Sequence, residues 1–294
     1  MIESPRIDSI LPDIFTVTRP IIQGTSALLV SANLLHLDNA SMFPIVEASS
    51  KIVPLTRLDP HTGMKMYASL GGYSVLGAIL RTDPQDYPKL LWRHCEDFPI
   101  WRGTVKFSDT LSDLLKVFDA TKLGDAAVEG SRDFPALVTL QEILLLHRSN
   151  TIKSTLRVSE IGSEMVTISP DRTIMDALKI MFQKRIRRIF LSDNEGTGGN
   201  SFISDRHIIR FLFSPMGLER SQKDPTNWVN AKLLTIERSQ AKIVHDGRTV
   251  NQAAMEMGDR VDDCLVCENS RKVVTRWDIV MKPWKSNDYS FAQN

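Results

Sequence analysis

A short pattern that recurs along the chain constrains its fold more than any other feature. Two small or apolar residues precede a hydroxyl residue, and a run of apolar positions follows three residues later. The hydroxyl stands at Ser74, Thr139, Ser204 and Thr275, so the intervals are 65, 65 and 71 residues. A nearly fixed period of this length indicates one structural unit repeated four times.

A second signature precedes the later hydroxyls. Residues 165–181 and 241–257 each begin with a short β-rich run, continue through a polar turn, and end with apolar residues at helical spacing. Residues 104–118 follow the same order. Between each helix and the next hydroxyl, two apolar runs flank a turn in the manner of a β-hairpin. Each unit therefore reads β-α-β-β-α, which places the chain in the α+β class.

The first repeat fits this pattern more loosely. Residues 14–17 take the place of its first strand, and Leu28, Leu29 and Ala32 mark its first helix. We interpret the extra stretch at residues 58–63 as a loop insertion.

A unit of this size exposes one apolar sheet face that it cannot bury alone. We therefore expect the units to pair, first with second and third with fourth. The boundary falls near residues 149–154, giving a domain 1–150 (repeats about 8–84 and 96–150) and a domain 151–294 (repeats about 157–215 and 228–283). The polar tail 285–294 is expected to be disordered. The sequence does not decide whether the four units close into a disk within one chain or two chains associate as a homodimer.

The charge balance limits the classes of partner, and the cysteine content bears on the redox state of the thiols. Lys and Arg number 36 against 35 Asp and Glu, so the net charge of +1 gives no general attraction to nucleic acid or to a membrane. No signal peptide or bilayer-spanning apolar run is visible, and we expect a cytoplasmic protein. The cysteines, Cys95, Cys264 and Cys267, are expected to be reduced.

Three features together resemble the CBS domain family. They are Pro170 and Asp171 before a helix, Arg187 and Arg188 leading into a middle strand, and the run Val-Val-Thr-x-x-Asp-Ile-Val at residues 273–280. In that family two repeats form a Bateman module, which holds AMP, ADP, ATP or S-adenosylmethionine between the repeats and relays its occupancy to a partner protein. The chain is similar to the four-repeat kind that carries no catalytic domain.

The Thr-x-x-Asp step also has a chemical rationale. A hydroxyl where a strand ends and a helix begins lies beside unpaired N–H groups and the positive end of the helix dipole, which suits a phosphate. A carboxylate one turn later can accept hydrogen bonds from both hydroxyls of a ribose. The resemblance gives these roles to Thr275 and Asp278, with the backbone around Ile243 facing the base.

The other repeats match this site less well. The third offers Thr167 and Ser204 in the matching places, but His207 replaces the acid and puts ribose binding in doubt. In the second, Thr139 and Glu142 are better explained as a helix capping box than as ligand contacts. The first has Ser74 and, three residues later, Gly77, which supplies no ribose contact. His207 alone is more typical of a capping or surface residue.

Two further groups invite other interpretations. Arg187 and Arg188, with Lys184 and Arg185, form a basic cluster that suits nucleotide phosphates or RNA, or simply a solvated helix end. Cys264 and Cys267 have the spacing of a metal or redox pair, but in a strand residues three apart point to opposite faces. We therefore expect no metal site.

No catalytic motif or paired general acid and base can be assembled from the sequence. We expect a non-enzymatic regulatory protein without a catalytic cofactor, which binds an adenine nucleotide or S-adenosylmethionine and acts on a partner protein. A ligand-free interaction scaffold and a protein that binds RNA or DNA through the arginine cluster are the alternatives.

Overall fold

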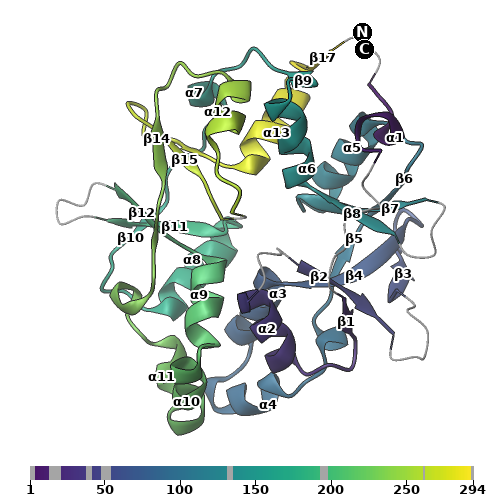
Figure 1. Cartoon of the computed structure of the whole chain (residues 1–294). Helices are drawn as coiled ribbons and strands as arrows, with labels where there is room; N and C mark the ends of the chain where they lie inside the picture. Colours follow the sequence, from purple (N-terminus) through teal and green to yellow (C-terminus); the bar gives the residue numbers. More distant parts are fainter. Residues whose placement is uncertain are drawn as a thin grey trace.

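Four similar units are arranged around a ring in the computed structural model (Figure 1), which describes residues 4–12, 21–37, 42–47, 54–130, 135–192, 198–260 and 262–292. The first unit contains β1 (Ile22–Gln23), α2 (Leu28–Leu37), β2 (Met42–Val46), β3 (Thr56–Leu58), β4 (Lys65–Gly71) and α3 (Gly72–Arg81). The second contains β6 (Thr104–Lys106), α5 (Leu111–Thr121), β7 (Asp125–Glu129), β8 (Ala136–Thr139) and α6 (Leu140–Arg148). The third contains β10 (Thr167–Ile168), α8 (Ile174–Lys184), β11 (Arg188–Ser192), β12 (Gly198–Ser204) and α9 (Asp205–Leu212). The fourth contains β14 (Lys242–Val244), α12 (Val250–Glu256), β15 (Leu265–Cys267), β16 (Val273–Val274) and α13 (Arg276–Lys285).

The strands of each unit follow one topology. In the second, third and fourth units the first strand is parallel to the second, and the second is antiparallel to the third. The helix between the first two strands begins after a threonine, Thr110, Thr173 or Thr249, whose hydroxyl accepts a hydrogen bond from a backbone N–H of the first turn. The predicted α+β class and β-α-β-β-α order are confirmed.

The first unit departs from the others. Residues 14–17 lie outside the described residues, and the described strand before α2 is β1, which is parallel to β2. An additional strand, β3, ends at Leu58, where the predicted loop insertion begins, and pairs with β4. A turn of residues 59–64 joins these two strands.

The sequence pattern places the hydroxyl of the first repeat three residues too far along the chain. Helix α3 begins at Gly72, so Gly71 is the residue equivalent to Thr139, Ser204 and Thr275. Ser74 instead lies in the first turn, where its Oγ accepts a hydrogen bond from the backbone N–H of Gly71 at 2.9 Å. A small hydroxyl can serve on either side of a helix start, and sequence pattern alone did not separate the two positions.

Short segments cross reciprocally between paired units. The residues before the second unit bridge from His94 to Ala27 of the first. Those before the fourth unit bridge from Lys232 to Thr173 of the third. Short strands make the same exchange, because β5 (Ile100–Arg102) pairs with β4 and β13 (Ser239–Gln240) pairs with β12. The units thus pair first with second and third with fourth, as two Bateman modules.

Helices join the two modules into a closed ring within one chain. Helices α2 and α3 of the first unit pack on α8 and α9 of the third, and α5 and α6 of the second pack on α12 and α13 of the fourth. Tyr73 of α3 stacks on Phe182 of α8 with their ring centroids 4.1 Å apart. The largest apolar core runs through the interface of the first and third units.

The predicted disorder of the tail is wrong for its described part. Strand β17 (Ser290–Phe291) pairs with β9 (Ile152–Lys153), which lies between the two modules. The carboxylate of Asp288 accepts hydrogen bonds from Ser154 and Thr155. No helix in the described part of the chain is long and apolar enough to span a membrane.

A helical annex extends the first and third units on one side of the ring. It consists of η2 (Pro84–Asp86), α4 (Tyr87–Leu91), α10 (Pro215–Lys223) and α11 (Pro225–Val229). The buried ring of Trp228 joins it, edge-on to Tyr87 at 5.4 Å and to Phe213 at 5.7 Å. The indole N–H of Trp228 donates to the carbonyl of Leu212 at 2.9 Å. The annex is therefore fixed to the ring by a packed aromatic core.

Candidate functional site

The carboxylate of Asp278 lies at the N-terminus of α13, one turn after Thr275. It is buried, with 4% of its surface exposed. Its Oδ2 accepts hydrogen bonds from the backbone N–H of Thr275 at 2.9 Å and from the Thr275 hydroxyl at 2.7 Å. The structure therefore brings together the two residues to which the sequence assigned phosphate and ribose binding.

A segment from the third unit reaches the same carboxylate. The Ser163 hydroxyl donates to Asp278 Oδ1 at 3.1 Å, and the backbones of Ser163 and Val273 exchange two hydrogen bonds of 2.8 Å. Lys282, one helical turn beyond Asp278, places its Nζ 3.1 Å from Oδ1. This junction of the two units carries one cation beside one carboxylate. The name Asp278 cleft denotes its four residues, Ser163, Thr275, Asp278 and Lys282.

The third unit contains an equivalent arrangement in which His207 replaces the acid. Ser204 precedes α9, and its backbone N–H donates to His207 Nδ1 at 3.0 Å. Nδ1 has a single lone pair, so the ring proton belongs on Nε2, which lies 3.1 Å from the Ser239 hydroxyl. Ser239 stands where Ser163 stands in the Asp278 cleft, because each pairs with the strand before the helix. These residues form the His207 cleft.

The chain places its own anion in the His207 cleft. Asp262, from the loop between α12 and β15, accepts a hydrogen bond from the Ser204 hydroxyl at 3.0 Å, and its Oδ1 lies 3.4 Å from Arg260 Nε. Burial alone raises the pKa of Asp262, but Arg260, the Ser204 hydroxyl and His207 outweigh it and hold this pKa below its ordinary value. Burial lowers the pKa of His207, despite the opposing charge of Asp262.

Arginines from three units hold the loop that carries Asp262. Arg188 of the third unit donates to the carbonyl of Asp262 at 2.6 Å. Arg276 of the fourth donates to the carbonyls of Gly258 and Arg260, at 3.0 and 2.6 Å. Arg148 of the second pairs with Asp259 at 2.6 Å. The position of Asp262 is therefore set by charge-assisted hydrogen bonds to the backbone of its loop.

The two positions predicted on first strands, Thr167 and Ile243, are equivalent to one another. Both are exposed, and 46% of the surface of Ile243 is exposed although it belongs to a strand. Thr167 follows the segment that reaches Asp278 through Ser163, whereas Ile243 follows the segment that reaches His207 through Ser239. The sequence analysis groups Ile243 with Asp278 and Thr167 with His207, and this grouping stays a prediction.

The remaining predicted residues have structural partners. Thr139 and Glu142 form a capping box, with the Thr139 backbone N–H donating to Glu142 Oε2 at 2.7 Å, as favoured from sequence. Arg187 pairs with the buried Asp205 at 2.7 Å, and this carboxylate raises the pKa of Arg187. Two of the three arginines of the predicted basic cluster, Arg187 and Arg188, therefore bind acceptors of the chain itself.

Sequence reasoning missed Ser163, Ser239, Lys282 and Asp262. A signal existed for the two serines, since each stands four residues before an equivalent position of a first strand, Thr167 or Ile243. Lys282 has the i, i+4 spacing to Asp278 that favours a pair on one helix face. No local sequence pattern predicts the role of Asp262, because that role depends on how its loop reaches the third unit.

The cysteine pair separates as predicted for a strand. Cys264 packs in the apolar cluster between the third- and fourth-unit sheets, while Cys267 packs in the cluster beneath the helices. Burial raises the pKa of Cys264 to about 11, so its thiol is protonated at neutral pH. Among the residues that the structure describes, no three His, Cys, Asp or Glu side chains are grouped to hold a metal ion.

Comparison with known protein families identifies one domain of the chain. The model of the CBS domain matches residues 158–214, which span the third unit. This unit is a CBS domain. No curated protein matches the sequence of the chain.

One solved structure shares the fold of nearly the whole chain. A protein from Methanocaldococcus jannaschii, named as a proposed archaeal homologue of g-AMPK, superimposes with a TM-score of 0.76 at 13% identity, covering 95% of this chain and 100% of that one. An uncharacterized conserved protein from Pyrococcus horikoshii gives 0.49 at 12% identity, covering 89% and 94%. A CBS-pair protein from Arabidopsis thaliana gives 0.35 at 14% identity, covering 46% and 98%. The first of these shares the overall fold of the four-unit ring.

Proposed function

We propose that this CBS-domain protein is a regulatory sensor that binds one adenine nucleotide, or S-adenosylmethionine, in the Asp278 cleft. CBS domains are typically regulatory modules rather than catalysts. The observation that carries the proposal is the buried carboxylate of Asp278, positioned at a helix N-terminus and contacted from the third unit by Ser163.

The arrangement supplies each group that a nucleotide requires. Ribose hydroxyls can replace Ser163 and Lys282 as donors to Asp278 Oδ1, since a carboxylate oxygen accepts about two hydrogen bonds. Lys282, freed from the carboxylate, then neutralises a phosphate beside the N-terminus of α13. The exposed face at Thr167 lies on the strand that follows Ser163 and is the side on which the base would pack.

This exchange of hydrogen bonds couples ligand occupancy of the Asp278 cleft to the arrangement of the third and fourth units. Ser163 belongs to the entry of the third unit and Asp278 to the fourth, so a ligand that competes for Asp278 Oδ1 alters a contact between units. A ligand that binds one arrangement better shifts the population toward it. A partner protein that contacts the ring would read this shift.

The His207 cleft is not part of the proposed nucleotide site. The turn residue there, His207, offers no carboxylate to accept the ribose hydroxyls, and its Nδ1 already accepts a hydrogen bond from the Ser204 backbone N–H. We therefore expect one nucleotide per chain in the second module rather than two.

A thermal-shift series tests the proposal. AMP, ADP, ATP, NADH and S-adenosylmethionine are added to the wild type, to Asp278→Ala, and to the matched control Glu142→Ala, which removes the equivalent cap of the second unit. Ligand at about a hundredfold over its Kd stabilises by roughly 2.7 kcal/mol, which corresponds to about 4–5 °C for a chain of this length. We expect one ligand to raise the Tm of the wild type and of Glu142→Ala, but not of Asp278→Ala.

Two outcomes would favour the alternatives. If no ligand moves the wild-type Tm, a ligand-free scaffold replaces the sensor. If RNA or DNA binds with an affinity that falls steeply with salt, and the nucleotides do not bind, recognition is electrostatic and belongs to the arginine-rich surface.

A further inference from the structure

The annex forms a pocket outside the β-α-β-β-α units. Helix α10 packs so closely on the end of α9 that a Cβ at Gly217 would lie 2.3 Å from the carbonyl oxygen of Phe211. Helix α11 is held from the other side by the buried Trp228. The carbonyl of Ala231 accepts a hydrogen bond from the backbone N–H of Ile174 at 3.0 Å, which fixes the chain after α11 to α8. The walls of the pocket are thus anchored at three points.

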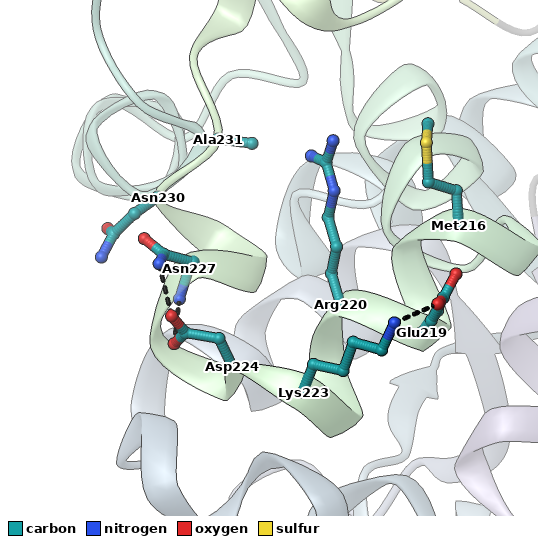
Figure 2. A pocket seen from close by; sticks show the side chains of 8 residues that line it. All are labelled: Met216, Glu219, Arg220, Lys223, Asp224, Asn227, Asn230 and Ala231. Carbon is teal, nitrogen blue, oxygen red and sulfur yellow. Dashed lines mark hydrogen bonds and ion pairs between the residues drawn. The ribbon is translucent and has the colours of Figure 1, made fainter.

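The pocket has a volume of about 460 Å³, within the range of small-molecule sites. Figure 2 shows the Arg220 side chain rising from α10 between Met216 on one side and Asn230 and Ala231 on the other. The side chain of Met216 is 56% exposed at its rim. The lining therefore combines two cations, two carboxylates, two carboxamides and a small apolar surface.

The charges of the lining leave one cation without an acidic partner. Glu219 pairs with Lys223 across one turn of α10 at 2.5 Å. Asp224 caps α11 and accepts hydrogen bonds from Asn227. The guanidinium of Arg220 lies 5.6 Å from the centroid of the Phe211 ring and forms no ion pair with any described carboxylate. Contact with an aromatic face leaves the edge donors of a guanidinium available.

We propose that this annex pocket binds a small molecule that carries a carboxylate or phosphate group. Arg220 would hold that group through two parallel hydrogen bonds, the arrangement that its planar fork favours. The Asn230 carboxamide can contribute a further donor, and Met216 with Ala231 offers a surface for an apolar part of the ligand. The pocket lies in the annex, apart from the Asp278 cleft at α13, so the ring would carry a second, independent ligand site (Figure 1).

The test follows the methyl group of Met216 by NMR in protein labelled with ¹³C-methyl methionine, with the signal assigned from Met216→Leu. Inorganic phosphate and propionate are titrated separately at constant ionic strength. We expect a saturable shift of the Met216 signal with one or both. Arg220→Gln should weaken the binding by at least about tenfold. Lys223→Gln, which removes one positive charge from the same pocket, should change the Kd by less than about twofold, because Lys223 is exposed and already paired.

Each outcome bears on the proposal. Binding of phosphate alone, propionate alone or both supports the site and identifies its head group. A shift that grows linearly without saturation, or equal affinity in the wild type and Arg220→Gln, overturns it. Arg220→Lys keeps the charge and loses the fork, so a folded protein with weakened binding separates bidentate recognition from general electrostatics. Asp278→Ala should bind as the wild type, which keeps this result independent of the nucleotide cleft.

Discussion

The Asp278 cleft and the His207 cleft are built to one plan and differ in where their negative charge comes from. Each has a hydroxyl before a helix, a polar side chain one turn later, and a serine from the neighbouring unit. In the first the acid is the turn residue itself. In the second the turn residue is a histidine, and the anion, Asp262, arrives from a distant loop.

This difference shows how a repeated site can diverge without losing its fold. A carboxylate beside a helix N-terminus is favourable because the dipole and the N–H groups attract it. Both clefts retain that favourable charge. Only in the Asp278 cleft does the charge come from the turn residue that faces the neighbouring serine, and we expect it to be the one that exchanges partners with a ligand.

The largest expected effect comes from replacing His207 with an acid, so that the His207 cleft resembles the Asp278 cleft. His207→Asp places a second carboxylate next to the buried Asp262, and two buried like charges should cost about 3–5 kcal/mol of the free energy of unfolding. His207→Asp combined with Asp262→Ala removes the clash and should recover most of that loss. Urea unfolding followed by circular dichroism measures both.

The same pair of variants sharpens the count of sites. With the acid now on the helix turn and the internal anion gone, calorimetry of the double variant should detect about two nucleotides per chain in place of one. If His207→Asp alone is as stable as the wild type, Asp262 does not occupy that cleft as an anion, and the comparison fails.

Much of the fold could be predicted because it is written in local periodicity. The apolar spacing of helices such as α8 and α12, and the hydroxyl before α9 and α13, reflect contacts within one unit. Thr275 and Asp278 were found for the same reason, since they lie three residues apart. The pattern failed at Ser74, where a serine in the first turn looks like a serine before the helix.

The rest depends on contacts that join distant segments. Ser163 and Asp278 are separated by 115 positions, and Ser204 and Asp262 by 58. The tail was expected to be disordered because it is polar, yet a single carboxylate, Asp288, satisfies donors of Ser154 and Thr155 and orders it. Hydrogen bonds of this kind leave no period in the sequence.

A smaller effect should distinguish the two serines that cross between units. Ser163→Ala removes the donor that approaches Asp278, and Ser239→Ala removes the equivalent partner of His207. One hydrogen bond to a charged group is worth about 1.5–3 kcal/mol at most. Ser163 competes with the ribose for Asp278 Oδ1, so we expect Ser163→Ala to lower the nucleotide Kd by about tenfold. Ser239→Ala should leave it within about twofold. Isothermal titration calorimetry measures both, and equal effects would show that the two clefts share the ligand.

The smallest expected effect is on the pH dependence of stability, and it concerns His207, the titrating group of the His207 cleft. Burial holds the pKa of His207 below its ordinary value of about 6.5, so the unfolded chain takes up a proton at a higher pH than the folded chain does. Stability must therefore fall as the pH drops from 7 toward 5.

His147, whose pKa burial lowers to about 4, contributes in the same direction, so the comparison is made in a His147→Gln background. There, His207→Asn should flatten the remaining slope by about 1 kcal/mol over this range, measured by urea unfolding at each pH. An unchanged slope would mean that His207 titrates normally and that its cleft is open to water rather than closed around Asp262.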